Sequence, residues 1–149
     1  SFSAAYFRQN WGDRMTGFES ARDSLASGTL AFEHLDAAQL VKHAFGLRTQ
    51  GIKHGKTPRL LYLYSEPSAF PNGQAISDDA IRAHRSELGE FASMVSGAEV
   101  EFQSFSYREL IDSWAADPNE QVRLHSRIIR DRFDVCRNAD SETDFFADQ

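Results

Sequence analysis

Gln39, Lys42 and His43 form a polar stripe on a helix that the sequence predicts from Asp36 to about Arg48. A lysine can stabilise negative charge that develops in a transition state, and a neutral histidine can accept a proton near pH 7. The opposite face of the same predicted helix is apolar and suits a protein core. We therefore take the three residues as candidate catalytic groups; a solvated helix face is the alternative interpretation.

Glu66 is the carboxylate closest to the end of a predicted strand, which covers about residues 59–64. In open α/β sheets, ligands bind beyond the carboxyl ends of the strands. Glu66 is therefore a further candidate catalytic residue, as a general base or a metal ligand. The alternative is a solvated loop acid before Pro67. We expect Glu66 and the polar stripe to face a common cleft.

Basic residues form two further groups that are candidates for contacts with nucleic-acid phosphates. Lys53 and Lys56 lie in a loop predicted for residues 51–58. The second group lies along one face of the last predicted helix and consists of Arg123, Arg127 and Arg130. Acidic side chains stand beside these arginines, so an exposed face of ion pairs is the alternative for that helix.

The other chemical groups in the sequence form no complete motif. His84 and Glu87 lie three residues apart on one predicted helix, but two ligands make an incomplete metal site. His125 lies on an apolar stripe, which is typical of a core histidine. Cys136 has no activating partner nearby in the sequence and is interpreted as structural. The chain contains no glycine-rich phosphate loop, no Gly-x-Ser-x-Gly and no His-Glu-x-x-His.

The fold that positions these groups is predicted to belong to the α/β class. A strand at about 59–64, a helix of about 19 residues and a second strand at about 99–104 form a βαβ unit, which predicts parallel strands with a right-handed crossover. The continuous Leu/Tyr composition of the first strand indicates that both of its faces are covered. We thus expect a small, mostly parallel sheet covered by about five helices.

Capping signals set the expected helix boundaries. Thr16, Asp36 and Ser106 each precede a Glu or Gln by three residues, which predicts capping boxes, and Ser77 is expected to be a simple N-cap. A short helix at 2–9 and a short strand at 29–35 are expected in the N-terminal part. The longer expected helices run over about 17–26, from Asp36 to about Arg48, between Ser77 and Gly97, from Ser106 to about Ala115, and from Asp117 to about Phe133.

Composition and charge narrow the class of protein. The chain has 149 residues, most simply one domain at 1–137 followed by an acidic, flexible tail at 138–149. A net charge of −6 does not favour unspecific nucleic-acid binding, although it is compatible with a local basic groove. No apolar run approaches the roughly 20 residues of a membrane span. A single cysteine is typical of a cytoplasmic protein.

Several segments together resemble the later part of bacterial restriction-endonuclease-like proteins of the PD-(D/E)XK nuclease superfamily. The segments, within residues 29–116, are Leu35–His43, Leu60–Tyr64 with Glu66 and Pro67, His84–Phe91 and Ser106–Leu110. In that fold, a helix with a Gln and a basic residue follows the catalytic strands, and further strand–helix pairs extend the sheet. The resemblance implies that Gln39 and Lys42 are accessory active-site groups, that DNA is the partner and that Mg²⁺ is the cofactor of the full-length protein.

The chain departs from that superfamily in its central motif. The superfamily holds Mg²⁺ with a carboxylate-x-Lys pair on a strand. Two positions before the three lysines of this chain, Lys42, Lys53 and Lys56, stand Leu40, Gly51 and His54. None of these is acidic. The resemblance therefore implies that the metal-binding acids lie upstream of Ser1, consistent with the missing initiator Met, and that this chain alone does not cut DNA.

Three hypotheses on function follow from the sequence. The first is a nuclease-like α/β domain, the catalytically incomplete C-terminal part of a Mg²⁺-dependent DNA endonuclease-like protein. The second is a non-enzymatic α/β module that binds a small molecule or a protein, which the acidic balance and the lack of a complete motif favour. The third is a structural domain that forms a homodimer, motivated by surplus aromatic residues: Trp11, Trp114, Phe145 and Phe146.

Overall fold

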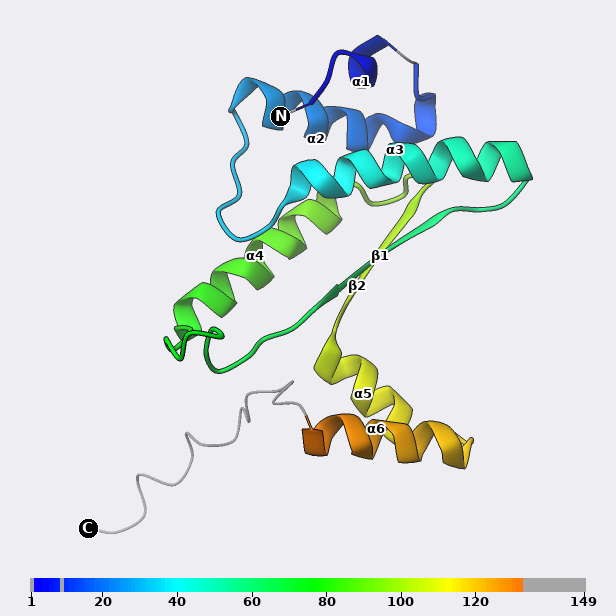
Figure 1. Ribbon diagram of the computed structural model, residues 1–149. Coiled ribbons are helices and arrows are strands. Elements are labelled where there is room, and N and C mark those ends of the chain that lie inside the picture. The colour runs from blue at the N-terminus through cyan, green and yellow to red at the C-terminus, as the bar shows by residue number, and fades with distance from the viewer. Residues whose placement is uncertain (1, 9, 133–149) are drawn as a thin grey trace. The chain divides into compact units, whose positions relative to one another are not determined.

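The computed structural model describes residues 2–8 and 10–132, so the expectations for the acidic tail, Cys136, Phe145 and Phe146 lie outside the described residues. The elements follow one another along the chain as Figure 1 shows. They are α1 (Ala5–Arg8), a 3-10 helix η1 (Asp13–Met15), α2 (Thr16–Ser27), α3 (Ala37–His54), β1 (Arg59–Tyr64), α4 (Asp78–Met94), β2 (Glu101–Ser106), α5 (Tyr107–Ala115) and α6 (Glu120–Arg132).

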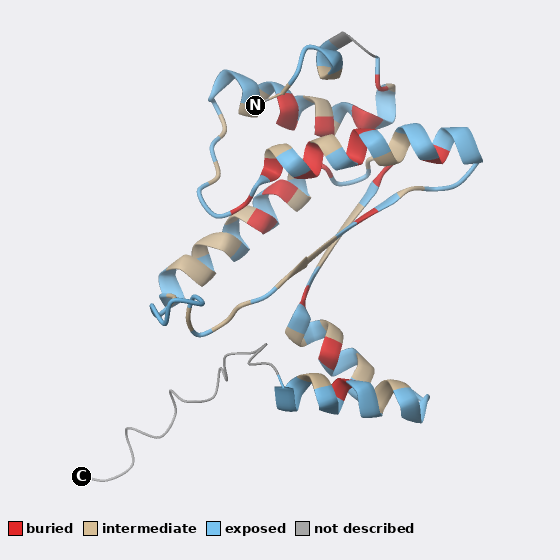
Figure 2. Cartoon of the chain, in the orientation of Figure 1, coloured by how far each residue is buried: buried red, intermediate tan, exposed pale blue. Residues whose placement is uncertain are grey.

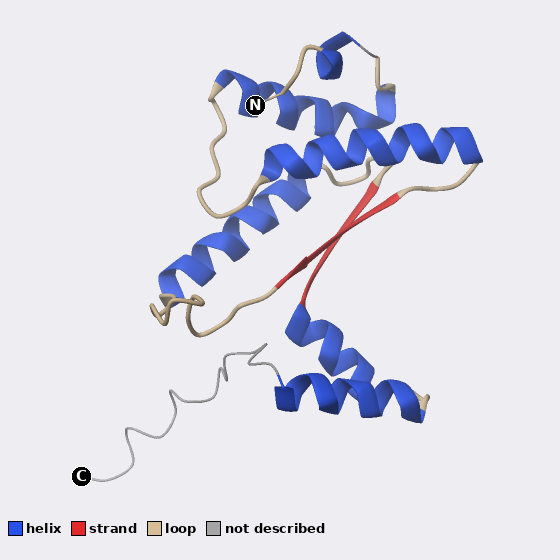
Figure 3. Ribbon diagram, viewed as in Figure 1, coloured by secondary structure: helices blue, strands red, loops and turns tan. Residues whose placement is uncertain are grey.

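Within the described residues, β1 and β2 form a two-stranded parallel sheet, and α4 connects them (Figure 3). This arrangement confirms the predicted βαβ unit and the α/β class. β2 begins two residues later than predicted because the chain before it is tied elsewhere: the N–H of Glu99 donates to the carbonyl oxygen of Arg14 at 2.9 Å. β2 begins at Glu101, whose N–H donates across to the carbonyl oxygen of Pro58, the residue before β1, at 3.2 Å.

The prediction that both faces of the first strand are covered is wrong at Leu61. Leu60 is buried, whereas Leu61 next to it has 52% of its surface exposed. Consecutive side chains of a strand point to opposite faces, so Leu60 lies on the covered face and Leu61 on the open face. Phe102 of β2 meets Phe91 of α4 edge to face, with ring centroids 5.2 Å apart. α4 thus packs against one face of the strands.

The chain divides into two compact units, each described here by itself. The first consists of Ser1–Tyr62 and Ser77–Ser104, and the second of Leu63–Ile76 and Phe105–Gln149. The expectation of a single domain at 1–137 stays a prediction. No helix in residues 2–8 and 10–132 combines the length and the apolar character that crossing a membrane requires.

The core of the first unit lies where α2 packs against α3 and α4 (Figure 2). Phe18 of α2 and Phe91 of α4 are fully buried, and their ring centroids lie 6.2 Å apart in an edge-to-face contact. Gly17 permits this close crossing, because a Cβ at that position would lie only 2.4 Å from the carbonyl oxygen of Met94. Other buried apolar residues of the unit include Trp11, Met15, Leu40, Val41, Ala44, Phe45, Leu88 and Val95.

Three of the predicted N-caps are confirmed, and the one at Ser106 is confirmed as a full capping box. The Oδ1 of Asp36 accepts the N–H of Gln39 at 3.0 Å, and the Oγ of Ser77 accepts the N–H of Ala80 at 3.2 Å. Ser106 and Glu109 form the expected reciprocal capping box, in which Ser106 Oγ accepts the N–H of Glu109 and Glu109 Oε2 accepts the N–H of Ser106. These caps satisfy backbone donors that the first helical turn leaves without intrahelical partners.

The prediction of a capping box at Thr16 is wrong. The chain enters α2 directly from the 3-10 turn η1, so Thr16 already has helical backbone angles and cannot be an extended N-cap. Glu19, its expected partner, lies instead 3.9 Å from the guanidinium of Arg22. The short strand expected at 29–35 is also wrong, because this segment is a loop whose backbone is held by Glu87 of α4.

α3 extends to His54, so the predicted helix end at about Arg48 is wrong, and the predicted loop at 51–58 is wrong for its first four residues. The helix ends at Gly55, which has a left-handed backbone at φ 62°, and the N–H of Lys56 donates to the carbonyl oxygen of Gly51 at 2.9 Å. A Cβ at Gly51 would lie 2.8 Å from the carbonyl oxygen of Lys56. Glycine is therefore required at position 51 because the returning chain passes close to it, and not because the helix ends there.

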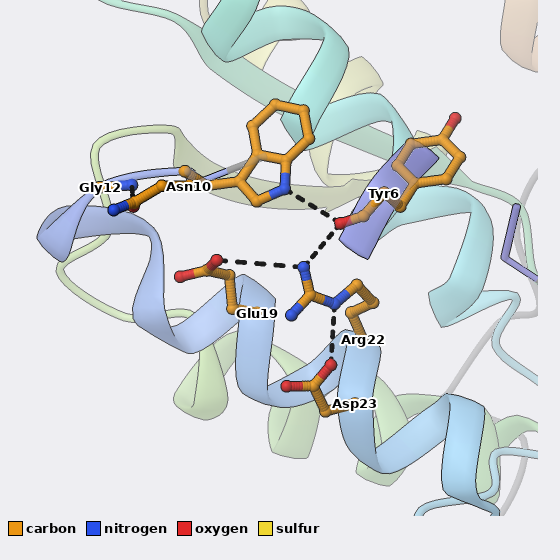
Figure 4. A network of polar contacts seen from close by, with 7 residues as sticks. Tyr6, Asn10, Gly12, Glu19, Arg22 and Asp23 are labelled. Atoms are coloured by element: carbon orange, nitrogen blue, oxygen red, sulfur yellow. Dashed lines mark hydrogen bonds and ion pairs between the residues drawn. The ribbon is translucent and has the colours of Figure 1, made fainter. Parts of the chain in front are cut away.

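The N-terminal segment is held by the buried guanidinium of Arg22 (Figure 4). Its Nη1 donates to the carbonyl oxygen of Tyr6 at 2.7 Å, and its Nε donates to Asp23 at 2.8 Å. The indole N–H of Trp11 donates to the same Tyr6 carbonyl at 3.1 Å. The guanidinium also lies over the ring of Phe7, 4.7 Å from its centroid. α1 is thus fixed by charge-assisted hydrogen bonds and a cation–π contact.

In the second unit, α5 and α6 pack as a helical hairpin. Ile111 of α5 and Ser126 of α6 are fully buried, and the Oγ of Ser126 donates to the carbonyl oxygen of Arg123. α6 begins at Glu120 rather than at the predicted Asp117, because Asp117 caps the N–H of Asn119 in the turn before the helix. The Oδ1 of Asn119 in turn accepts the N–H of Gln121 at 2.9 Å, so Asn119 provides the cap at the start of α6.

Candidate nucleic-acid interface

α3 carries a polar stripe that contains no acidic residue. The helix spans 18 residues, and neither Asp nor Glu occurs among them. Residues 11 positions apart lie within about 20° of one another around a helix and about 16 Å apart along it. Because α3 continues to His54, Lys53 falls in line with Lys42, and His54 with His43. The complete stripe consists of Gln39, Lys42, His43, Gly46, Gln50, Lys53 and His54.

The C-terminal end of the stripe presents exposed cationic side chains. Lys53, His54 and Lys56 are all exposed. The reversal at Gly55 fixes their backbone, since the N–H groups of Gly55 and Lys56 return to carbonyls of the last helical turn. The helix dipole leaves negative potential at this end, which favours cations here and offers an alternative, purely structural reason for them.

Neighbouring cations differ from these lysines in having carboxylate partners. Arg48 Nε lies 3.0 Å from Glu99, and Arg59 Nε lies 2.9 Å from Glu101. Within the described part of the chain, neither Lys53 nor Lys56 has an ion pair with Asp or Glu. The positive charge at this end of α3 is therefore not compensated by a direct contact.

The N-terminal half of the stripe contains the three candidate catalytic residues. Gln39 and His43 are exposed. Lys42 is half-buried, and its Nζ lies 5.5 Å from the centroid of the Phe2 ring. The ammonium group of Lys42 therefore lies near the N-terminal segment. The structure brings Gln39, Lys42 and His43 onto one helix face as predicted, and their catalytic role stays a prediction.

Glu66 follows β1 at the carboxyl end of the strand, as predicted, and is half-buried. It belongs to the second unit, whereas the polar stripe belongs to the first. The common cleft expected from the sequence therefore stays a prediction. No group of three or more His, Cys, Asp or Glu that could hold a metal ion occurs within residues 2–8 and 10–132.

Two of the three arginines on α6 have intramolecular contacts. The Nη1 of Arg123 donates to the carbonyl oxygens of Asp117 and Pro118, at 2.7 and 2.8 Å. Arg130 forms an ion pair with Asp112 of α5, a partner that the sequence analysis did not consider. Arg127 is exposed. Contact of this face with nucleic acid stays a prediction, and both Arg127 and Arg130 are exposed for it.

His84 and Glu87 have different partners on the inner side of α4. The Nε2 of His84 lies 3.1 Å from the Oη of Tyr62, whose pKa is raised by burial and by the charge of Asp36. The two carboxylate oxygens of Glu87 accept the N–H groups of Glu33 and His34, each at 2.8 Å. Sequence reasoning missed Tyr62, because the run of Leu and Tyr in β1 indicated only core packing.

Glu87 is expected to make stability depend on acid pH. Burial raises its pKa, but the N–H groups of Glu33, His34 and Leu35, with the charge of His34, outweigh burial and lower the pKa below 4.5. The ionised carboxylate therefore stabilises the fold above about pH 4.5, and this contribution is lost as pH falls through the lower folded-state pKa. The gain is at most about 1 kcal/mol because water screens the group.

The check compares Glu87→Gln with the wild type by urea unfolding at pH 7 and pH 3. We expect the variant to be less stable at pH 7 and the difference to shrink at pH 3. An equal difference at both pH values would contradict the role of the ionised carboxylate. Glu90→Gln, an exposed position on the same helix, is the matched control and should change neither value.

No family model, curated protein or solved structure matches this chain. The resemblance to the PD-(D/E)XK superfamily therefore stays a prediction.

Proposed function

We propose that this chain is a nuclease-like α/β domain that contacts the phosphate backbone of DNA through the polar stripe of α3 and Lys56. The proposal makes it the catalytically incomplete part of a Mg²⁺-dependent endonuclease-like protein. The observation that carries it is the absence of any carboxylate from an 18-residue helix with an exposed, basic outer face. A cationic helix face with hydrogen-bonding Gln side chains suits phosphate oxygens.

The net charge of −6 does not oppose this proposal, because most of the acidic excess is in the sequence after Arg132. The residues after Arg132 include five of the 22 acidic residues and one of the 16 basic residues. The remainder of the chain thus has 17 acidic and 15 basic residues and is close to neutral. A local cationic surface on a nearly neutral body can bind a phosphate backbone with a salt-dependent affinity.

In this proposal, residues outside 2–8 and 10–132 carry out metal-dependent cleavage. No carboxylate-x-Lys pair, the motif that holds Mg²⁺ in the PD-(D/E)XK superfamily, occurs in the sequence. The domain's own role is to hold the DNA backbone, with Gln39 and Lys42 as accessory groups. We therefore expect this chain to bind duplex DNA and to leave it intact in the presence of Mg²⁺, in a gel assay that would reveal nicking of supercoiled plasmid.

Replacement of both Lys53 and Lys56 by alanine is expected to weaken DNA binding about tenfold and to lower the slope of log affinity against log salt by about 2. Fluorescence anisotropy with a labelled duplex, at several salt concentrations, measures both quantities. Each lysine contributes by releasing a counterion from the phosphate backbone, so the two effects should appear together.

The matched control for this experiment is Arg82→Ala, which also removes a positive charge. Arg82 is exposed on α4 and pairs with Asp79. Loss of the Arg82 side chain should change the slope of log affinity against log salt by less than loss of either lysine side chain does. Equal effects of Arg82 and of the lysines would indicate unspecific attraction and would contradict the proposal. So would the absence of any salt-dependent binding by the wild type.

A further inference from the structure

Lys42 differs from the rest of the polar stripe, because it is half-buried whereas every other residue of the stripe is exposed. It lies at the edge of the stripe, since Phe45, about one turn further along α3, is fully buried. A lysine at such an edge ordinarily extends its stem over the surface and keeps its ammonium in water. The ammonium of Lys42 instead lies 5.5 Å from the centroid of the Phe2 ring. Phe2 thus covers one side of this cation.

The ring of Phe2 is held by two aromatic rings that follow it in the N-terminal segment, residues 2–8. It meets the ring of Tyr6 edge to face with centroids 6.0 Å apart, and that of Phe7 with centroids 6.3 Å apart. Arg22 in turn fixes Tyr6 through its carbonyl oxygen (Figure 4), and the Arg22 guanidinium lies over the ring of Phe7. The position of Phe2 beside Lys42 therefore follows from an anchor within the same compact unit.

The anchor of the N-terminal segment is stronger than the contact of Phe2 with Lys42. Arg22 is buried and makes charge-assisted hydrogen bonds. Phe2 is half-buried and reaches Lys42 only through its ring. A phosphate oxygen forms a charge-assisted hydrogen bond with an ammonium, which is stronger than a cation–π contact beside water. A phosphate can therefore displace the Phe2 ring while Arg22 still holds the segment.

We propose that the N-terminal segment restrains DNA binding by α3, because the ring of Phe2 covers Lys42 until a phosphate displaces it. This inference rests on the proposed function and adds a regulation to the same face. In the covered state, the face binds phosphates through Lys53 and Lys56 at its C-terminal end. Displacement of Phe2 adds Lys42, about 16 Å from Lys53 along the helix, as a further phosphate contact. The segment is thus an internal inhibitor of the DNA-binding face.

Acetylation of lysine amines, quantified by mass spectrometry, tests the cover on the full chain without DNA. Lys53 is exposed and serves as the internal reference. We expect Lys42 to react at least about twofold more slowly than Lys53, and Phe2→Leu to accelerate Lys42 about twofold to fivefold. Phe2→Tyr keeps an aromatic face and should retain the slow rate. Equal rates at Lys42 and Lys53 in the wild type, or no acceleration in Phe2→Leu, would overturn the proposal.

Fluorescence anisotropy with a labelled duplex tests the effect of the cover on binding. Phe2→Leu should tighten binding about twofold to fivefold and increase the slope of log affinity against log salt by about 1, because one more cation reaches a phosphate. Addition of Lys42→Ala to Phe2→Leu should abolish both effects. Phe70→Leu, which replaces an exposed aromatic ring of the second unit, is the matched control and should change neither quantity.

The outcomes separate a failure of the cover from a failure of the proposed function. Circular dichroism should show that Phe2→Leu folds, since it replaces a half-buried ring by an apolar side chain. DNA binding that is the same in the wild type and in Phe2→Leu would overturn the cover and leave the proposed function intact. No salt-dependent binding by either chain would contradict the proposed function and this inference together.

Discussion

Gly17→Ala is expected to destabilise the protein by roughly 3 kcal/mol. Inside a helix this substitution ordinarily stabilises, by about 0.5–1 kcal/mol. Here a Cβ would lie 2.4 Å from the carbonyl oxygen of Met94 and 3.1 Å from the Cα of Val95. Both contacts are with backbone, so no side chain can rotate away, and α2 and α4 would have to separate. That separation would loosen the contact between the buried rings of Phe18 and Phe91.

Gly89→Ala provides the matched control for this first prediction. Gly89 also lies inside a helix, but a Cβ there would have no neighbour within 4 Å. Its replacement should therefore stabilise by the ordinary helix-propensity gain. Urea unfolding followed by circular dichroism measures both variants. Opposite signs for the two substitutions are the expected result, and a stabilising Gly17→Ala would show that α2 and α4 do not cross as closely as described.

Phe45→Ala is expected to cost about 3–5 kcal/mol, the usual range for the loss of a buried aromatic ring. Phe45 of α3 is fully buried and stacks on Trp11, with ring centroids 4.1 Å apart and planes at 15°. The ring of Tyr6 lies 6.1 Å away, and the guanidinium of Arg22 lies 5.9 Å from the Phe45 centroid. The substitution leaves a cavity and also removes the ring on which the N-terminal segment packs.

Two further substitutions make the Phe45 prediction specific. Phe70→Ala removes the same ring from a position with 51% exposure and should cost less than about 0.5 kcal/mol. Phe45→Leu keeps much of the volume and should fall between the two. Urea unfolding gives all three values. A loss at Phe45→Ala no larger than that at Phe70→Ala would contradict the description of Phe45 as the centre of this aromatic cluster.

Elements with local signals were predictable from the sequence. The caps at Asp36, Ser77 and Ser106 depend on a side chain and a backbone N–H only three residues away, so their residue types suffice to indicate them. The βαβ unit was predictable for a similar reason. Two short apolar segments flank one amphipathic helix, and parallel strands require such a connection.

Glycines and threonines gave weaker signals, because the same residue serves different purposes. Gly51 was placed at the start of a predicted loop, but it lies inside α3 and permits the close approach of the Lys56 carbonyl. Thr16 has the residue type of an N-cap, yet the 3-10 turn before it already sets helical angles. Only the path of the neighbouring chain distinguishes these cases, and a single sequence does not contain that path.

The candidate site was predictable in part. Helical periodicity placed Gln39, Lys42 and His43 on one face. Because the helix was predicted to end too early, the continuation of this face through Lys53 and His54 was not predicted. Partners distant in sequence were not predictable. Arg130 pairs with a residue 18 positions away, and Glu87 binds backbone groups 53 and 54 positions away. Such contacts depend on how the helices pack, which residue spacing does not encode.

Binding of the DNA phosphate backbone by the carboxylate-free face of α3 can be followed residue by residue in solution. The most direct measurement is an NMR titration of the chain with a short duplex, following the backbone amide of every residue. We expect the largest shifts to fall on α3 and its C-terminal turn, from His43 through Gln50 to Lys56, and to diminish as salt is raised. Shifts confined to other elements, or none at low salt, would contradict it.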